Sequence, residues 1–432
     1  MRRRYARRGW AVGAALSALL AADFAAGPDA VLRAQERPLA LKGARLLTMT
    51  GRVVEDGVLV MEDGRITALG SDVIVPRGAD VVDVSGKTVM PGFIDGFTNL
   101  GSADYGSLGR DDDEATDPLT PHLRITDAID PENTFIPLAR ESGVTAALCA
   151  PAEGNLLAGQ SALVRLAGES VEEMTVEFPV AVHVSLGEAP KLRYGERNRM
   201  PQTRMGSAAL LRQTLVDARG YAAKLGRHGE NGGGADAAPP HDPNLEALLP
   251  VLRGEVPLMV SADRFDDIHT ALRIAREFDV PMILNHGAES HRVTGELSEA
   301  GVPVVWGPGD AVFRELESRR GGAGTPGALR RERIPFAFQT GSVENVAGLL
   351  DEARAAARAG LPVKEALKGL TLYPARIFGV DDRLGSLEVG KMADVVVLDG
   401  DPLDALSEVE MVFVGGEKIA KTAWRPRSSP RS

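Results

Sequence analysis

Two β-rich ends flank a middle in which continuous apolar runs alternate with amphipathic segments. Near each end, short segments alternate polar and apolar residues or carry β-branched ones, with Gly-containing turns such as Asp63-Gly64 and Ser85-Gly86 between them. We therefore expect one small β domain built from both ends of the chain. Its strands are predicted at 39–47, 53–61, 65–69 and 80–83, and at 394–398, 411–414 and 418–420.

The apolar runs of the middle predict buried parallel strands, because strands covered on both faces are apolar throughout. Helices are expected between them; at 343–359, for example, apolar residues recur at helical spacing. Eight strands alternating with helices favour a closed (β/α)₈ barrel of the TIM type, with an open doubly wound sheet as the alternative. The strands are predicted at 89–95, 144–150, 162–166, 179–186, 256–262, 280–286, 302–306 and 334–340, and further helices at 132–142, 207–225 and 264–278.

Residues 1–34 have the layout of an export signal. Five arginines between Arg2 and Arg8 precede the apolar run 10–20, which small residues follow. An uncleaved membrane anchor is the alternative. We expect a periplasmic or extracellular protein that does not contact the membrane once the signal is removed. The predicted organisation is an export signal at 1–34, a β-sandwich at 35–90 and 384–424, a barrel at 91–383 and a tail at 425–432.

Charge and cysteine content narrow the classes of partner and chemistry. Six Arg and two Asp lie in residues 1–34, so removing them takes the formal charge from −11 to −15. Such an acidic chain argues against nucleic acid or an anionic membrane as a partner. Cys149 is the only cysteine, and its apolar surroundings predict a buried, unreactive thiol, with a catalytic nucleophile as the alternative. The acidic run 111–114 is interpreted as solvated surface, with contact to calcium or a cationic substrate as the alternative.

Three motifs carry a family resemblance: VMPGFID at 89–95, TLYPARIFG at 371–379 and GSLEVGKMADVVVL at 385–398. They resemble the amidohydrolase superfamily, in particular its imidazolonepropionase-like branch, and the resemblance extends over nearly all of residues 38–420. It implies a (β/α)₈ barrel with a composite β-sandwich domain. It also implies a hydrolase that acts on carbon–nitrogen bonds other than peptide bonds.

The resemblance further implies where a catalytic metal would be held. Such enzymes bind one or two divalent metals through an H-x-H after the first strand, a Lys or similar residue on the fourth, His on the fifth and sixth, and Asp on the eighth. The metal activates a water molecule, and the Asp takes its proton. In this chain Phe97 and Asn99 stand at the H-x-H positions, Ser261 at the fifth-strand position and Gly341 near the eighth. None of these four is a good zinc ligand.

Two histidines remain at the expected mouth of the barrel. His286 keeps the sixth-strand position, and His183 lies at or beside the fourth. They are the candidate catalytic residues, and together with Asp263 they are the candidate ligands of a single zinc ion, with no metal at all as the alternative. Each also has a structural interpretation: the histidines as hydrogen-bonded core residues, and Asp263 as the N-cap of a helix that begins near Arg264.

The sequence leaves the function open between two classes. One is an amidohydrolase-family enzyme; the other is a catalytically silent, metal-free barrel that binds a small-molecule ligand or pairs with an active paralogue. Metal-free acid–base chemistry by His183 and His286 is a third option. A homo-oligomer or hetero-oligomer is compatible with each, and whether the chain is an enzyme is not decided by its sequence.

Overall fold

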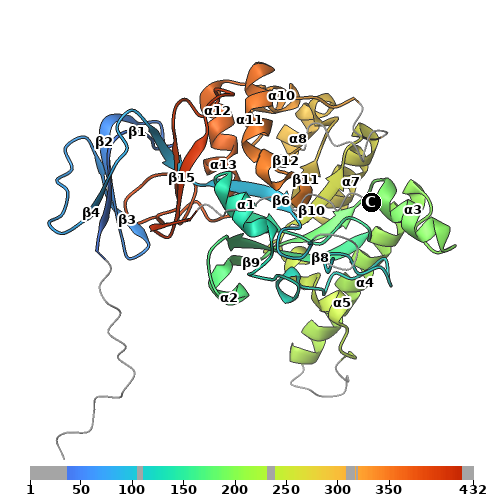
Figure 1. Cartoon of the computed structure of the whole chain (residues 1–432). Coiled ribbons are helices and arrows are strands. Elements are labelled where there is room, and N and C mark those ends of the chain that lie inside the picture. Colours follow the sequence, from blue (N-terminus) through green and yellow to red (C-terminus); the bar gives the residue numbers. More distant parts are fainter. Residues whose placement is uncertain (1–36, 105–109, 231–238, 308–316, 318–319, 421–432) are drawn as a thin grey trace, which may run out of the picture. The chain divides into compact units, whose positions relative to one another are not determined.

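The computed structural model describes residues 37–104, 110–230, 239–307, 317 and 320–420 (Figure 1). The predicted export signal and C-terminal tail lie outside the described residues. Among the described residues no helix combines the length and apolar character required to cross a bilayer.

Strands from both ends of the chain form one hydrogen-bonded sheet, as the alternating patterns predict. Its path runs β16-β15-β14-β5-β1-β2-β3, with β4 paired to β1. The junction between the two ends is the antiparallel pair β14–β5, in which Val395 lies opposite Pro91. The strands are β1 Leu39–Leu47, β2 Val53–Glu62, β3 Arg65–Gly70, β4 Asp80–Asp83, β5 Thr88–Pro91, β14 Val395–Leu398, β15 Val409–Val414 and β16 Glu417–Lys418.

The middle of the chain forms a nearly closed eight-stranded barrel whose strands follow one another in chain order. Closure between its first and last strands uses Thr340, whose N–H and hydroxyl donate to Asp95, and the N–H of Gly341, which donates to Phe97 O at 3.0 Å. The strands are β6 Phe93–Thr98, β7 Val144–Cys149, β8 Leu157–Arg165, β9 Thr175–Ser185, β10 Leu258–Ala262, β11 Met282–His286, β12 Val304–Trp306 and β13 Phe336–Phe338.

The barrel departs from the predicted all-parallel order at β8, which is antiparallel to both β7 and β9. The short segment 150–156 joins β7 to β8 without a helix. Such a connection turns the chain back on itself, whereas a parallel return needs a crossover of a dozen or more residues. The apolar pattern identified the strand but could not give its direction.

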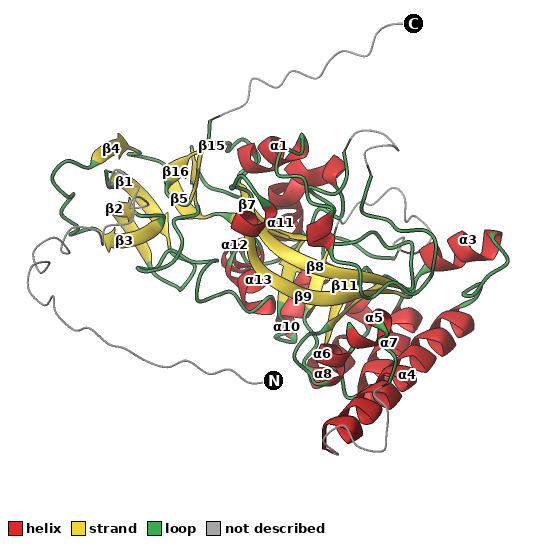
Figure 2. Ribbon diagram, turned by 90° about the horizontal axis from the view of Figure 1, so that it is seen from below, coloured by secondary structure: helices red, strands yellow, loops and turns green. Residues whose placement is uncertain are grey.

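Helices cover the outside of the barrel strands (Figure 2). In α7, for example, Ile268, Ala271 and Leu272 are buried on one face, and Asp266 and Asp267 stand in the first turn, where the helix dipole favours negative charge. The helices are α1 Phe135–Glu141, α2 Val171–Met174, α3 Glu188–Glu196, α4 Arg204–Glu230, α5 Pro243–Glu246, α6 Leu249–Leu252, α7 Phe265–Phe278, α8 Thr294–Ala300, α10 Thr325–Arg331, α11 Leu349–Arg358, α12 Val363–Gly369 and α13 Leu372–Ile377, with 3₁₀ turns at Ile125–Asp127, Ser290–Arg292 and Val343–Gly348.

A partly buried ion pair joins the barrel to the terminal sheet. Arg165 at the end of β8 donates from Nε and Nη2 to both carboxylate oxygens of Asp394, and Gly415 N–H donates to the same carboxylate. Asp394 belongs to the motif at 385–398, so part of that motif's role is to hold the two substructures together.

Candidate functional site

A layer of polar side chains lies at the carboxyl ends of the barrel strands, directly above the apolar interior. Ser261, Asn285 and Gln339 each follow an inward-facing apolar residue two positions earlier on the strand. Asn285 Nδ2 donates to Ser261 Oγ at 3.0 Å, and Gln339 Nε2 donates to Asn285 Oδ1 at 2.9 Å and to Val305 O at 2.8 Å. The chain of bonds fixes the upper rim of the interior, where this fold places functional groups.

His286 ends β11 in the left-handed region, at φ +68°, and is buried. Its Nδ1 lies 3.0 Å from Gly307 O, which can only accept, so Nδ1 carries the proton. Its Nε2 lies 2.5 Å from Glu153 Oε1. Two acceptors do not approach so closely, so the His286–Glu153 pair shares a proton at this contact. The geometry makes the pair a unit for holding and moving a proton.

Glu153 was not identified from the sequence. It stands in the connection between β7 and β8, outside the family motifs, and only the antiparallel turn at β8 brings it over the barrel mouth. Its side chain is 26% exposed, compared with 4% for that of His286, so it is the partner that faces a ligand.

His183 also lies at the mouth, buried, with its ring 5.7 Å from that of Phe97. Burial lowers its pKa to about 3; the negative charge of Glu153 offsets this in part, and His286 adds to it. The imidazole is therefore neutral at physiological pH. Its Nε2 has no hydrogen-bond partner among the described residues, and neither has Gln339 Oε1. Buried polar atoms normally have hydrogen-bond partners, so we infer that a ligand or water in the mouth bonds these two atoms.

Phe97 and Asn99 fill the positions at which the family carries its H-x-H. The Phe97 ring is buried between the two histidines, 5.7 Å from His183 and 5.5 Å from His286. Asn99 donates from Nδ2 to Asp112 at 2.8 Å and accepts from Val343 N–H at 2.9 Å. An aromatic ring and an amide that is bonded through both its nitrogen and its oxygen therefore replace two metal donors.

Asp263 is buried, and its carboxylate contacts the loop that follows β11. Its Oδ1 accepts from Ala288 N–H at 3.1 Å. It does not cap the following helix: Glu289 Oε2 accepts from Phe265 N–H at 3.1 Å, and the N-cap residue Arg264 makes no capping bond. The N-cap interpretation is therefore wrong, because Asp263 turns to the neighbouring loop.

The residues at the mouth do not fit a resident metal ion. Within the described ranges, no three His, Cys, Asp or Glu side chains form a group that could hold one, so His183, His286 and Asp263 are not assembled as ligands. Both nitrogens of His286 are engaged, and Gly341 offers no side chain. Amidohydrolases in general use divalent metals, so this donor set is a departure from the superfamily pattern.

The acidic run 111–114 is not free surface. Asp112 is buried and bonds Asn99 and Arg110, and Asp113 pairs with Arg193 on α3. The interpretation as solvated surface is therefore wrong for these two carboxylates, because Asn99 and the neighbouring Arg110 bind Asp112, and Arg193, 80 residues further along the chain, binds Asp113. Cys149 is buried, as predicted, and burial raises the pKa of its thiol.

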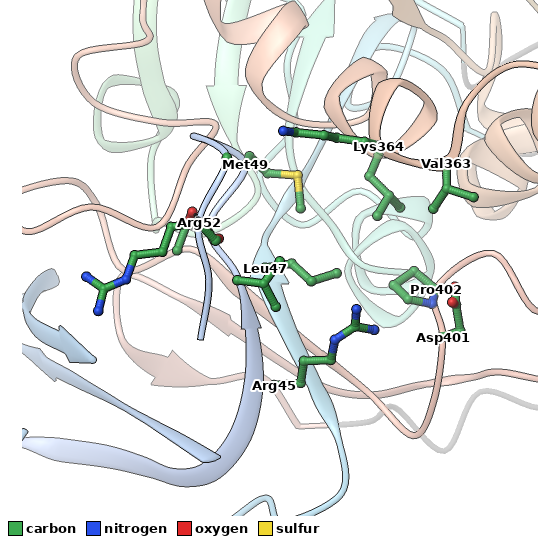
Figure 3. A pocket seen from close by; sticks show the side chains of 12 residues that line it. Arg45, Leu47, Met49, Arg52, Val363, Lys364, Asp401 and Pro402 are labelled. Atoms are coloured by element: carbon green, nitrogen blue, oxygen red, sulfur yellow. Dashed lines mark hydrogen bonds between the residues drawn. The ribbon is translucent and has the colours of Figure 1, made fainter. Parts of the chain in front are cut away.

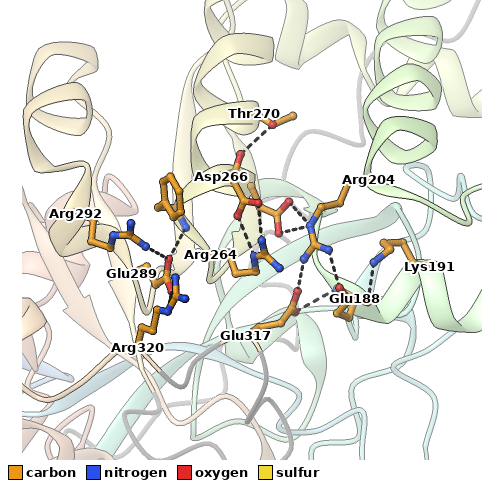
Figure 4. A network of polar contacts seen from close by, with 12 residues as sticks. Glu188, Lys191, Arg204, Arg264, Asp266, Thr270, Glu289, Arg292, Glu317 and Arg320 are labelled. Atoms are coloured by element: carbon orange, nitrogen blue, oxygen red, sulfur yellow. Dashed lines mark hydrogen bonds and ion pairs between the residues drawn. The ribbon is translucent and has the colours of Figure 1, made fainter.

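Beside the mouth, Arg204 on α4 binds three carboxylates (Figure 4). It donates from Nε to Asp267 on α7, from Nη1 to Glu188 on α3 at 2.7 Å, and from Nη2 to Glu317 at 2.9 Å. Burial raises the pKa of Asp267 and of Glu317, and the negative charge of Asp263 adds to the rise at Glu317. The Arg204 guanidinium thus links α4 to α3, to α7 and to residue 317.

Asp95 gives a testable pH dependence. It is fully buried, and burial raises its pKa to about 7 although Thr340 and the Phe97 N–H donate to it. A raised carboxyl pKa contributes stability that is complete below the unfolded value of 3.8 and is lost as the pH rises to about 7.

Asp95→Asn keeps acceptors for Thr340 N–H and Phe97 N–H and offers Nδ2–H to the Thr340 hydroxyl. We expect the variant to gain stability over the native chain between pH 4 and pH 7, by at most roughly 4 kcal/mol. Urea unfolding of both proteins across this range measures it; a stability difference that does not change with pH would contradict the assignment.

Comparison with known proteins supports the fold and assigns the chain to a family. The model of the amidohydrolase family matches residues 267–419. An amidohydrolase structure from Thermotoga maritima superposes with a TM-score of 0.84 at 33% identity, covering 89% of this chain and all of that one. An imidazolonepropionase from Mesorhizobium japonicum is 25% identical over 89% of this chain and 96% of its own length. The amidohydrolase tasK of Hapsidospora irregularis is 28% identical over 84% of this chain, which spans only 39% of that protein.

The nearly closed barrel, the terminal sheet and these similarities define an amidohydrolase fold. The chain belongs to the amidohydrolase superfamily, in its imidazolonepropionase-like branch. The predicted resemblance is thereby confirmed, and the substitutions at Phe97, Asn99, Ser261 and Gly341 stand out against it.

Proposed function

We propose that this amidohydrolase-family protein hydrolyses a carbon–nitrogen bond other than a peptide bond in a small molecule, with the His286–Glu153 pair as the proton-transfer group. The contact of 2.5 Å between His286 Nε2 and Glu153 Oε1 at the barrel mouth carries the proposal. Family membership supports the reaction class, and the donor set argues for a site that does not depend on a metal held at the family positions.

In the proposed reaction, Glu153 takes a proton from the attacking water, whose oxygen adds to the carbonyl carbon. The carbon–nitrogen bond then breaks, and Glu153 returns the proton to the leaving nitrogen. His286, held between Gly307 O and Glu153, positions the carboxylate. Neutral His183, in its Nε2–H tautomer, donates to the carbonyl oxygen as negative charge develops there.

Metal analysis tests this proposal directly. We expect the chain purified without chelator to contain zinc, manganese and iron far below one atom per chain. In a panel of cyclic amides and dipeptides, turnover of the cyclic amides should be unchanged by a chelator, and the dipeptides should not be hydrolysed. Stoichiometric metal that is lost in His286→Ala would show that His286 is a ligand and would overturn the proton-transfer role.

A binding barrel without turnover is the second candidate, favoured by the substituted donors Phe97, Asn99, Ser261 and Gly341. In that case a cyclic amide binds at the mouth and is not consumed. The two candidates separate in one experiment: calorimetric binding of the panel, followed by product analysis. A ligand that binds, survives prolonged incubation and loses affinity in His183→Ala supports the second candidate. A pairing with an active paralogue, in which this chain would be the silent subunit, remains a prediction.

A further inference from the structure

A cavity lies away from the polar layer at the barrel mouth, between the terminal sheet and helix α12 (Figure 3). It has a volume of about 270 Å³. Its residues come from the end of β1, the β1–β2 turn and the start of β2, from α12, and from the segment after β14. Its lining includes no member of the polar layer and none of His183, His286 and Glu153, so the cavity is separate from the barrel mouth.

The floor of this cavity is apolar and its rim exposes further apolar surface. Leu47, Met49 and Leu367 are buried beneath it. Val53 and Val363 stand on the rim with 48% and 52% of their surface exposed. Pockets that bind small molecules combine such apolar surface with a few polar groups, and they often lie where two substructures meet.

Two cations border this floor from opposite sides. Figure 3 shows the Arg45 guanidinium turned toward the space between Leu47 and Pro402, and the Lys364 side chain lying along the other border beside Met49. Arg45 uses Nε on Glu55 at 3.2 Å, and no contact involving its terminal nitrogens is found among the described residues. The described residues give Lys364 no hydrogen bond or ion pair.

The charge balance points to a ligand with one negative charge. Arg45, Arg52 and Lys364 line the cavity together with Asp401, and Glu55 pairs with Arg45. The three cations and the two carboxylates leave a single net positive charge around the cavity. The chain as a whole has a formal charge of −11. The Arg52 guanidinium points away from the floor, and the Asp401 carboxylate accepts from Leu403 N–H in its own loop.

The turn that shapes the cavity is preformed. Thr48 N–H and Thr48 Oγ1 both donate to Arg52 O, and Leu387 N–H donates to Thr48 O at 3.1 Å. Met49 at φ +67° and Gly51 at φ +109° give the turn its shape. A ligand therefore meets a fixed surface and does not have to order it, which favours binding.

We propose that this cavity binds a small monoanion with an apolar body, of the class of aryl or medium-chain carboxylates. The carboxylate lies between Arg45 and Lys364, and the apolar body lies on Leu47, Met49 and Leu367. This site is independent of the reaction proposed for the barrel mouth.

Calorimetric titration of the whole chain with hexanoate tests the proposal, with uncharged hexanamide as the ligand control. We expect saturable binding of hexanoate and about tenfold weaker binding of hexanamide, because a charge-assisted contact is lost. Arg45→Met and Lys364→Met should each weaken hexanoate about tenfold for the same reason. Both side chains are exposed, so neither change should alter folding, which circular dichroism verifies.

Lys418→Met is the matched control, since Lys418 is an exposed lysine on β16 outside the cavity. We expect it to bind hexanoate as the native chain does, and Glu153→Gln to do the same. Absence of saturable binding, equal binding of hexanoate and hexanamide, or an equal effect of Lys418→Met and Lys364→Met would each overturn the proposal. A loss of hexanoate binding in Glu153→Gln would also overturn it, because the ligand would then lie at the barrel mouth.

Discussion

Glu153→Gln is expected to lower turnover of a cyclic amide substrate by roughly 10²–10⁴-fold, the range typical for loss of a positioned general base. Glutamine keeps the shape of the side chain and a contact to His286 Nε2, but it cannot accept a proton from water. The loss should therefore appear in kcat, with KM little changed. Steady-state kinetics of the purified variant, with its thermal unfolding temperature as a check of the fold, measure this.

Glu344→Gln is the matched control for that experiment. Glu344 lies 3.6 Å from Arg110, is 60% exposed and makes no contact with the His286–Glu153 pair. We expect its kcat to stay within about twofold of native, as for a surface carboxylate whose ion pair is weak. Full activity in Glu153→Gln would remove Glu153 from the mechanism, whereas equal losses in both variants would show an unspecific effect of charge.

Arg204→Met is expected to cost about 3–5 kcal/mol of folding stability at pH 7, the range found when one partner of a buried ion pair is removed. The change leaves Asp267 and Glu317 without their main cation, and both are largely buried. Methionine occupies similar space, so lost packing contributes little. Urea unfolding of the variant and the native chain measures the difference.

The cost should depend on pH with a definite sign. The pKa values of Asp267 and Glu317 are already raised by burial, and loss of Arg204 raises them further. Carboxyls of this kind stabilise the fold at low pH and lose that contribution as the pH rises through their folded pKa, so the deficit of the variant grows from pH 5 to pH 8. Arg253→Met is the control: the Arg253–Glu255 pair is about half exposed on both sides, and we expect a change below about 1 kcal/mol. A deficit that shrinks with rising pH, or one equal to that of Arg253→Met, would contradict the role given to Arg204.

Local sequence patterns were sufficient to predict most of the strands and to identify the family. The predicted strands at 39–47 and 80–83 coincide with β1 and β4, and those of the barrel coincide with β7 and β12 to within a few residues. The family resemblance also placed His183, His286, Ser261 and Phe97 at the barrel mouth, and the structure has them there, at the carboxyl ends of the strands.

What the sequence by itself determined is therefore the set of elements, their alternation and the absence of the family's metal donors at Phe97, Asn99 and Gly341. These properties depend on residues close together in the chain. The tertiary structure alone decided the direction of β8, the approach of Glu153 to His286 across the mouth, the displacement of Asp263 toward Ala288 and the three carboxylates around Arg204. The physical reason is that each of these contacts joins segments far apart in sequence, and its formation depends on burial and charge in the folded chain, which no local pattern records.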